Sequence, residues 1–293
     1  MKHERFELYS REGEILRADL RYVPSGSPKP AIVFLHGFKG FKDWGPFPTM
    51  LEELAKAGFI TLGFNFSHNG IGEDLMTFTE LERFARNTFT RELDETDDVL
   101  HALVLSEKVP LPAEEFDRDA IGLMGHSRGA SLAILVASQS SLVRAVVGLS
   151  PVSDFNRFSE RQIELWKQDG HLAVQNQRTN QEMRLNVSLL EDLELNGERL
   201  DILSAARKLV RQEKPLLLIT GEQDLTTRPE EAQAIATAAD GPFTELRLIP
   251  NTGHTFGTEH PFKGITPAFR RVLRLTEGFL EQYLIHDQIP RQP

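Results

Sequence analysis

The sequence predicts an α/β protein built on a mostly parallel central sheet with helices on both of its faces. Short apolar runs alternate with helical patterns along the chain, and no internal repeat interrupts this alternation. Most of the runs are almost continuously apolar, which is typical of parallel strands that are covered on both sides. The length of 293 residues suffices for one large core, so we expect a single domain over residues 1–293.

The first strands are expected to form an antiparallel edge. Residues 5–10 and 14–23 flank a short turn, and the second run alternates apolar with polar residues. A period of two is typical of a strand that has one face in the core and one in solvent. Buried strands are then expected over residues 31–36, 59–66, 120–125, 145–150, 215–220 and 244–250.

Helical patterns separate these runs, at residues 49–57, 80–104, 130–138, 229–239 and 265–285. The interval between Ser150 and Pro215 is too long for one crossover helix, and it mixes large apolar residues with many charges. We therefore expect a small helical insertion over residues 154–203, which forms a lid on the core. Trp166 could pack inside this lid or line an acyl pocket beneath it.

Composition excludes several classes of function. The formal net charge of -10 argues against nucleic acid as the main partner, because phosphate binding needs clustered basic residues. The longest apolar runs are too short to cross a bilayer, and the N-terminal sequence has no signal-peptide pattern, so we expect a cytoplasmic protein without a membrane partner. Cysteine is absent, which excludes disulfides, Cys-ligated zinc and a cysteine nucleophile. Nothing in the sequence indicates an oligomeric state.

The motif Gly125-His126-Ser127-Arg128-Gly129 is the strongest chemical signal. It has the form G-x-S-x-G and lies between an apolar run and a helical pattern. A sharp strand-to-helix turn would expose the serine hydroxyl at its tip, and the small flanking residues permit that turn. The sequence therefore predicts Ser127 as a nucleophile.

A serine nucleophile needs a base that a carboxylate orients. Asp224 and His254 follow the two last predicted strands, in the order Ser, Asp, His. Because sites in open α/β sheets form at the carboxyl ends of strands, we expect these three side chains to converge as a catalytic triad. Glu222 is the alternative acid and His260 the alternative base. No metal-ligand spacing occurs, so no metal and no cofactor are expected.

Acyl transfer also creates an oxyanion, which needs fixed amide donors. We expect the backbone N–H groups of Arg128 and Phe38 in this role, since Gly37 lets the loop after its strand approach closely. Lys39 and Lys42 follow in the same loop. They could favour substrates that carry a negative group, or they could be solvated surface lysines.

With these motifs in order, the chain resembles the α/β-hydrolase superfamily over almost its whole length. It looks most similar to bacterial feruloyl and cinnamoyl esterases and to prolyl-oligopeptidase-like hydrolases. This resemblance implies hydrolysis of a small-molecule ester through an acyl-enzyme, without a cofactor. An acyltransferase, thioesterase or peptidase could use the same triad. A non-catalytic binding protein on this scaffold is the alternative from another class.

Overall fold

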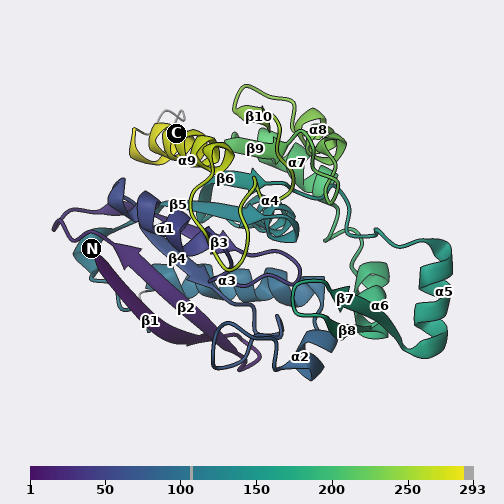
Figure 1. Cartoon of the computed structure of the whole chain (residues 1–293). Coiled ribbons are helices and arrows are strands. Elements are labelled where there is room, and N and C mark those ends of the chain that lie inside the picture. Colours follow the sequence, from purple (N-terminus) through teal and green to yellow (C-terminus); the bar gives the residue numbers. More distant parts are fainter. Residues whose placement is uncertain (106–107, 287–293) are drawn as a thin grey trace.

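The computed structural model describes residues 1–105 and 108–286, and its centre is a twisted eight-stranded sheet (Figure 1). The strand order is β1-β2-β4-β3-β5-β6-β9-β10. The β1–β2 and β2–β4 pairs are antiparallel, and every other neighbouring pair is parallel. The strands are β1 (Lys2–Tyr9), β2 (Ile15–Tyr22), β3 (Lys29–Leu35), β4 (Ile60–Phe64), β5 (Phe116–His126), β6 (Val143–Leu149), β9 (Leu216–Gly221) and β10 (Thr244–Ile249). The predicted fold class and its antiparallel N-terminal edge are confirmed.

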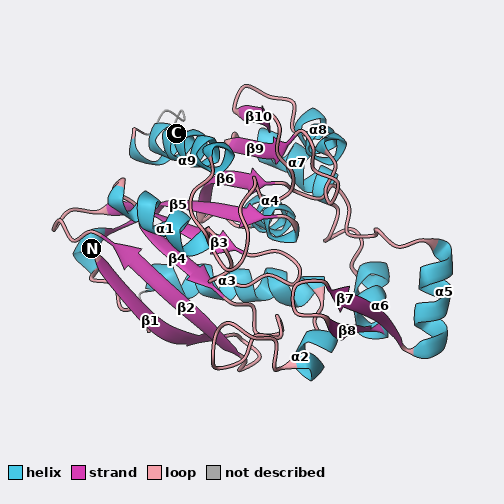
Figure 2. Cartoon of the chain, in the orientation of Figure 1, coloured by secondary structure: helices cyan, strands magenta, loops and turns pink. Residues whose placement is uncertain are grey.

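Helices cover both faces of this sheet (Figure 2). The α-helices of the described chain are α1 (Phe47–Lys56), α2 (Leu81–Ala85), α3 (Phe89–Leu105), α4 (Arg128–Gln139), α5 (Glu160–Asp169), α6 (Val187–Leu195), α7 (Ile202–Arg211), α8 (Pro229–Ala238) and α9 (Pro267–Leu280), of which α5 and α6 lie beside the sheet and not on its faces. The single helix expected over residues 80–104 is two helices, because Arg86, Asn87 and Thr88 interrupt it. None of the helices in the described part of the chain is long and apolar enough to cross a membrane.

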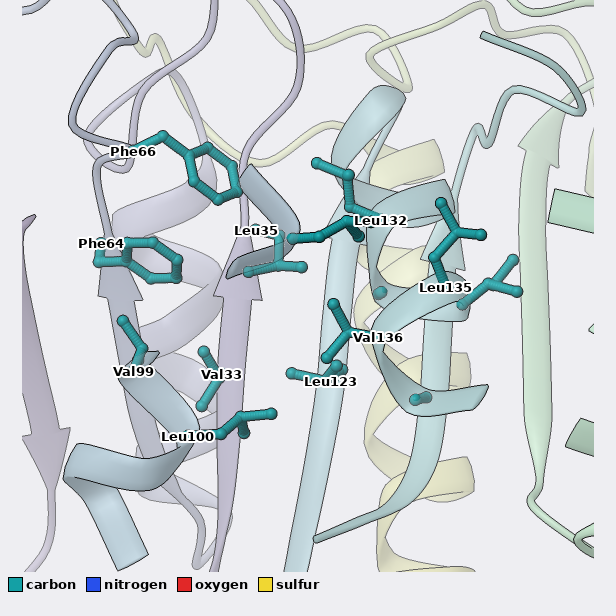
Figure 3. Close-up of a cluster of buried hydrophobic side chains, with 14 of the residues drawn as sticks. Val33, Leu35, Phe64, Phe66, Val99, Leu100, Leu123, Leu132, Leu135 and Val136 are labelled. Carbon is teal, nitrogen blue, oxygen red and sulfur yellow. The ribbon is translucent and has the colours of Figure 1, made fainter. Parts of the chain in front are cut away.

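The core follows from the alternation of side chains along each buried strand. Val33 and Leu35 belong to one apolar cluster with α3 and α4, whereas Ile32 and Phe34 belong to a second cluster with α1 and α9. Figure 3 shows the first cluster, in which the helices pack onto β3, β4 and β5. Burial on both faces explains why these strands are almost continuously apolar in the sequence.

The insertion over residues 154–203 is not purely helical. Between α5 and α6 it contains an antiparallel hairpin of β7 (His171–Asn176) and β8 (Gln181–Asn186). The hairpin and its two helices project from one end of the sheet in Figure 1, and α2 packs against β8. Trp166 is fully buried inside the insertion, where its indole N–H donates to the Leu185 carbonyl over 2.8 Å. It therefore forms the interior of the insertion.

Candidate active site

Ser127 lies at the turn between β5 and α4, in a backbone conformation with φ 57° and ψ −126°. Positive φ is unfavourable for a residue with a side chain, so the surrounding structure must hold this turn. A Cβ atom at Gly129 would lie 2.3 Å from the Leu35 carbonyl oxygen, which leaves room for glycine alone. The Ser127 N–H donates to the Leu149 carbonyl over 2.8 Å and fixes the turn to the neighbouring strand. The sequence motif thus forms a strained strand-to-helix elbow, in which Ser127 is half-buried.

Asp224 and His254 come together from the loops after β9 and β10. His254 Nδ1 donates to Asp224 Oδ2 over 2.9 Å, and the Asp224 side chain is inaccessible to solvent. The other oxygen of Asp224 accepts the backbone N–H groups of Thr226 and Thr227, over 2.9 and 3.0 Å. Burial alone would raise the pKa of Asp224, but the hydrogen bonds from His254 and Thr227 lower it to about 2.

Thr227 is a member of this network that the sequence analysis missed. Its hydroxyl oxygen lies 2.9 Å from Asp224 Oδ2 and 3.2 Å from His254 Nδ1. The same oxygen lies 3.1 Å from the carbonyl oxygen of Ser150, at the end of β6. A hydroxyl three residues after an aspartate in a loop is a local signal of such a turn.

The His254 loop is docked on the nucleophile elbow. His126 Nε2 donates to the backbone carbonyl of His254 over 3.0 Å, and the two imidazole rings lie 4.7 Å apart. Burial lowers the pKa of His126 to about 3, so this residue stays neutral beside His254. No hydrogen bond joins the Ser127 hydroxyl to His254 within the described ranges. Such catalytic hydrogen bonds commonly tighten only in the complex with substrate.

The loop after β3 lies against the other side of Ser127. A Cβ atom at Gly37 would lie 2.9 Å from the Ser127 Cβ, so the glycine allows the loop to reach the serine. His36 fixes the loop, because its Nδ1 donates to the Gly37 carbonyl over 3.0 Å. Arg128 is the first residue of α4, and the first N–H groups of a helix have no acceptor within it. Of the predicted oxyanion-hole residues, Arg128 therefore follows the serine directly, and Phe38 follows the glycine that approaches it.

A buried ion pair lies behind this loop, and sequence reasoning missed it. Arg128 Nη2 donates to Glu92 Oε1 of α3 over 2.7 Å, and the Glu92 side chain is 1% exposed. Burial raises the pKa of Glu92, and the opposing effects of Arg128 and Asn87 are smaller. The arginine was predicted only as a backbone donor, and a glutamate on a helix gives no sequence signal of this pairing.

The alternative residues occupy other roles. Glu222 is exposed, and its backbone N–H donates to Ile249, so it is not placed under His254 as Asp224 is. His260 Nδ1 accepts the N–H of Gly45 over 3.0 Å, and its ring packs against Phe41. These contacts tie loops together.

The two lysines of the β3 loop differ from each other. Lys42 is buried, and its amine lies 2.8 Å from Asp19 and 2.6 Å from Asp43. Its charge is therefore neutralised, and it is neither a solvated lysine nor an anchor for an anionic substrate. Lys39 Nζ donates to the carbonyl of Gln175 in β7 over 2.9 Å, which joins the loop to the insertion.

Comparisons with known proteins agree with this architecture. The chain is similar to an α/β hydrolase from a Penicillium species (18% identity, TM-score 0.71, covering 97% of this chain and 100% of that one). It is also similar to an esterase of Pyrococcus furiosus (17%, TM-score 0.64, 97% and 91%) and to a monoacylglycerol lipase of Paleococcus ferrophilus (17%, TM-score 0.65, 92% and 99%). Identities this low establish the fold alone. No curated protein matches the chain.

A family model matches residues 32–268, a span that contains Ser127, Asp224 and His254. The match supports a hydrolase activity without specifying which bond is cleaved. It covers most of the chain, from β3 to the start of α9. By this match, the chain belongs to the alpha/beta hydrolase family.

Proposed function

We propose that this protein is a serine hydrolase that cleaves small-molecule carboxylic esters through an acyl-enzyme intermediate. The observation that carries the proposal is the Asp224–His254 hydrogen bond of 2.9 Å, held on the elbow that presents Ser127. A strained serine, a histidine and a buried carboxylate in this order form the arrangement that activates a hydroxyl for acyl transfer.

The Asp224 carboxylate determines which nitrogen of His254 acts as the base. Because Oδ2 accepts a hydrogen bond from Nδ1, the lone pair of the imidazole is on Nε2. Ser127 Oγ bonds to the ester carbonyl carbon while Nε2 takes the hydroxyl proton. The ionised Asp224, whose pKa is held at about 2, stabilises the imidazolium that results.

The remaining steps use the same groups. The N–H groups of Phe38 and Arg128 stabilise the oxyanion of the tetrahedral intermediate. This intermediate collapses with cleavage of the bond to the alkoxy oxygen, which receives the proton from His254 Nε2 and leaves as an alcohol. Water then attacks the acyl-enzyme, with His254 again as the base, and releases the carboxylic acid and Ser127.

Hydrolysis of p-nitrophenyl acetate by the native protein and by Ser127→Ala tests this proposal. We expect the variant to lose at least about three orders of magnitude in kcat, because no other group supplies the nucleophile. Ser131→Ala removes a hydroxyl one turn along α4, which donates to the Val152 carbonyl, and serves as the matched control. Its activity should remain within about threefold of the native value once thermal unfolding shows that it is folded.

Labelling with a fluorophosphonate, followed by mass spectrometry of the peptides, checks the nucleophile directly. The adduct is expected on Ser127 and on no other serine. A folded native protein that hydrolyses no ester and takes up no label would refute the proposal. Activity in Ser127→Ala equal to that of the native protein would refute it as well.

A further inference from the structure

We propose that Glu92 and Arg128 are positioning residues that hold the two amides of the oxyanion hole in place. This inference rests on the proposed function and adds residues to it. Arg128 contributes one of the two proposed amides through its own backbone. Its guanidinium carbon lies 4.9 Å from the ring centroid of Phe38, whose backbone contributes the other amide. One side chain therefore links both donors.

The guanidinium is itself fixed from behind. Its Nη2 atom donates to Glu92 Oε1 over 2.7 Å, and its carbon lies 5.3 Å from the ring centroid of Phe89. Only 11% of the Arg128 side chain and 1% of the Glu92 side chain are exposed. Glu92 Oε1 also accepts the Asn87 amide over 2.7 Å, and Phe89 stacks on Phe155 at 4.3 Å. The pair is thus anchored in α3 and its packing.

The ring of Phe38 has Phe84, Lys39 and Arg128 as neighbours. It stacks on Phe84 of α2, with the ring centroids 5.6 Å apart and the planes within 29° of parallel, and Lys39 Nζ lies 5.4 Å from its centroid. Arg128 stacks on the same ring. Displacement of the guanidinium would therefore release the ring of Phe38 and shift the loop that carries its N–H. An error of about 1 Å in a catalytic group can cost about two orders of magnitude in rate.

The choice of an ion pair at this position needs an explanation. A buried ion pair is commonly no more stabilising than apolar residues of the same volume. A guanidinium, however, is planar and directs its donors in a fixed fork, so it can stack on rings and point at a carboxylate at the same time. The amide donors of an oxyanion hole must be held in fixed positions, and the ion pair can hold them.

The experiment compares an ester with the matching thionoester, in which sulfur replaces the carbonyl oxygen. Sulfur accepts hydrogen bonds weakly, so the ratio of kcat/KM for ester to thionoester reports on the oxyanion hole. We expect Glu92→Gln and Arg128→Met to lower this ratio by about tenfold or more, through kcat and with KM nearly unchanged. A loss of packing alone would slow both substrates equally.

Glu95→Gln is the matched control, since Glu95 is another buried carboxylate of α3 and bonds to Ser67. It should leave the ratio unchanged. Phe38→Leu keeps the backbone amide but removes the ring, and we expect it to lower the ratio as Arg128→Met does. Arg128→Lys keeps the charge without the planar fork and should restore the ratio only in part. These milder variants serve if Arg128→Met does not fold.

The outcomes separate the two proposals. An unchanged ratio in folded Glu92→Gln and Phe38→Leu, in an enzyme whose esterase activity depends on Ser127, overturns the positioning role alone. A native protein in which ester hydrolysis does not depend on Ser127 overturns the proposed function and this inference with it.

Discussion

Two buried carboxylates contact neighbours of Ser127 in the site, Asp224 through His254 and Glu92 through Arg128, and the surroundings of the two carboxylates differ. Asp224 follows β9, and its two oxygens accept hydrogen bonds from two backbone N–H groups and from His254. Glu92 comes from α3, and its Oε2 atom has no hydrogen-bond partner within the described structure. The pKa of Asp224 is lowered to about 2, whereas burial raises the pKa of Glu92. The anionic form of the carboxyl group is thus well stabilised at Asp224 and poorly stabilised at Glu92.

This difference follows from the proposed roles. A carboxylate that must stabilise a transient imidazolium has to remain ionised throughout the reaction, so its oxygens are saturated with donors. A carboxylate that fixes the position of one arginine needs only one well-directed contact. We therefore expect changes at Asp224 to affect mainly the chemistry, and changes at the Glu92–Arg128 pair to affect stability as well as geometry.

The largest effect is expected for Asp224→Asn. Thr226 and Thr227 donate to Oδ1, so the carbonyl oxygen of the new amide stays there and its NH₂ group faces His254 Nδ1. A donor opposite Nδ1 forces the imidazole proton onto Nε2, which can then no longer accept the proton of Ser127. The loss in kcat should reach about four orders of magnitude, measured with p-nitrophenyl acetate.

Glu222→Gln is the control for this variant, because Glu222 lies two residues away and is exposed. Its kcat should stay within about twofold of the native value. Comparable losses in the two variants would show that the acid has been assigned to the wrong residue.

The next effect is on stability. Arg128→Met leaves Glu92 buried without its cation, and removal of one partner from a buried pair costs about 3–5 kcal/mol in the free energy of unfolding. The pKa of Glu92 is already raised by burial, and loss of Arg128 raises it further above the ordinary value. The folded protein then binds a proton that the unfolded chain releases, so the variant is relatively stable at low pH and loses stability as pH rises.

Urea unfolding at pH 5 and pH 8 measures this. The difference between the native protein and Arg128→Met should be larger at pH 8. Arg199→Met removes an arginine that pairs with Asp94 at the surface, and its smaller cost should not vary in this way. A cost for Arg128→Met that is independent of pH would contradict the ionised pairing.

The comparison also explains which contacts of the site could be predicted from the sequence and which could not. Ser127 and Asp224 follow buried strands, whereas His254 follows β10, an edge strand that is mostly half-buried or exposed and not buried as expected. Parallel strands bring their carboxyl ends to one edge of the sheet, so local patterns still suffice to predict the Asp224–His254 contact. Glu92 contacts Arg128 through the packing of α3 on α4, which depends on helix position and rotation and on nothing local. The β7–β8 hairpin was missed for a related reason. The two strands are short and rich in polar residues, and they lie between two helices. The helical pattern of the flanking residues therefore hides the alternation that is typical of strands.

Glu95 of α3 is a third buried carboxylate, and its pKa also differs from that of Asp224. Burial raises the pKa of Glu95 from 4.5 to about 7, although Ser67 donates to it, with smaller effects from Glu92 and Arg91. The unfolded chain loses this proton at lower pH, so the native protein should lose up to about 3 kcal/mol of stability as pH rises from 4.5 to about 7. Glu95→Gln should remove this contribution to the pH dependence, which urea unfolding across that range measures.

Glu198→Gln, on the exposed surface, should keep the native pH dependence of stability. If Glu95→Gln has the same pH profile as the native protein, then the loss of stability has its origin in another group, and Glu95 is not the proton-binding carboxylate of α3.

The smallest effect is expected for Lys39, which joins the loop after β3 to the insertion near the protein surface. Lys39 Nζ donates to the Gln175 carbonyl over 2.9 Å near the surface, whereas the neighbouring Phe38 is held from inside by Arg128. A hydrogen bond of this kind contributes about 1 kcal/mol at most, so Lys39→Met should change the unfolding free energy by less than that and leave the ratio of ester to thionoester hydrolysis unchanged. If Lys39→Met instead lowers that ratio as much as Arg128→Met, then Lys39, which contacts both the inserted hairpin and the Phe38 ring, and not the buried ion pair, sets the position of the Phe38 amide.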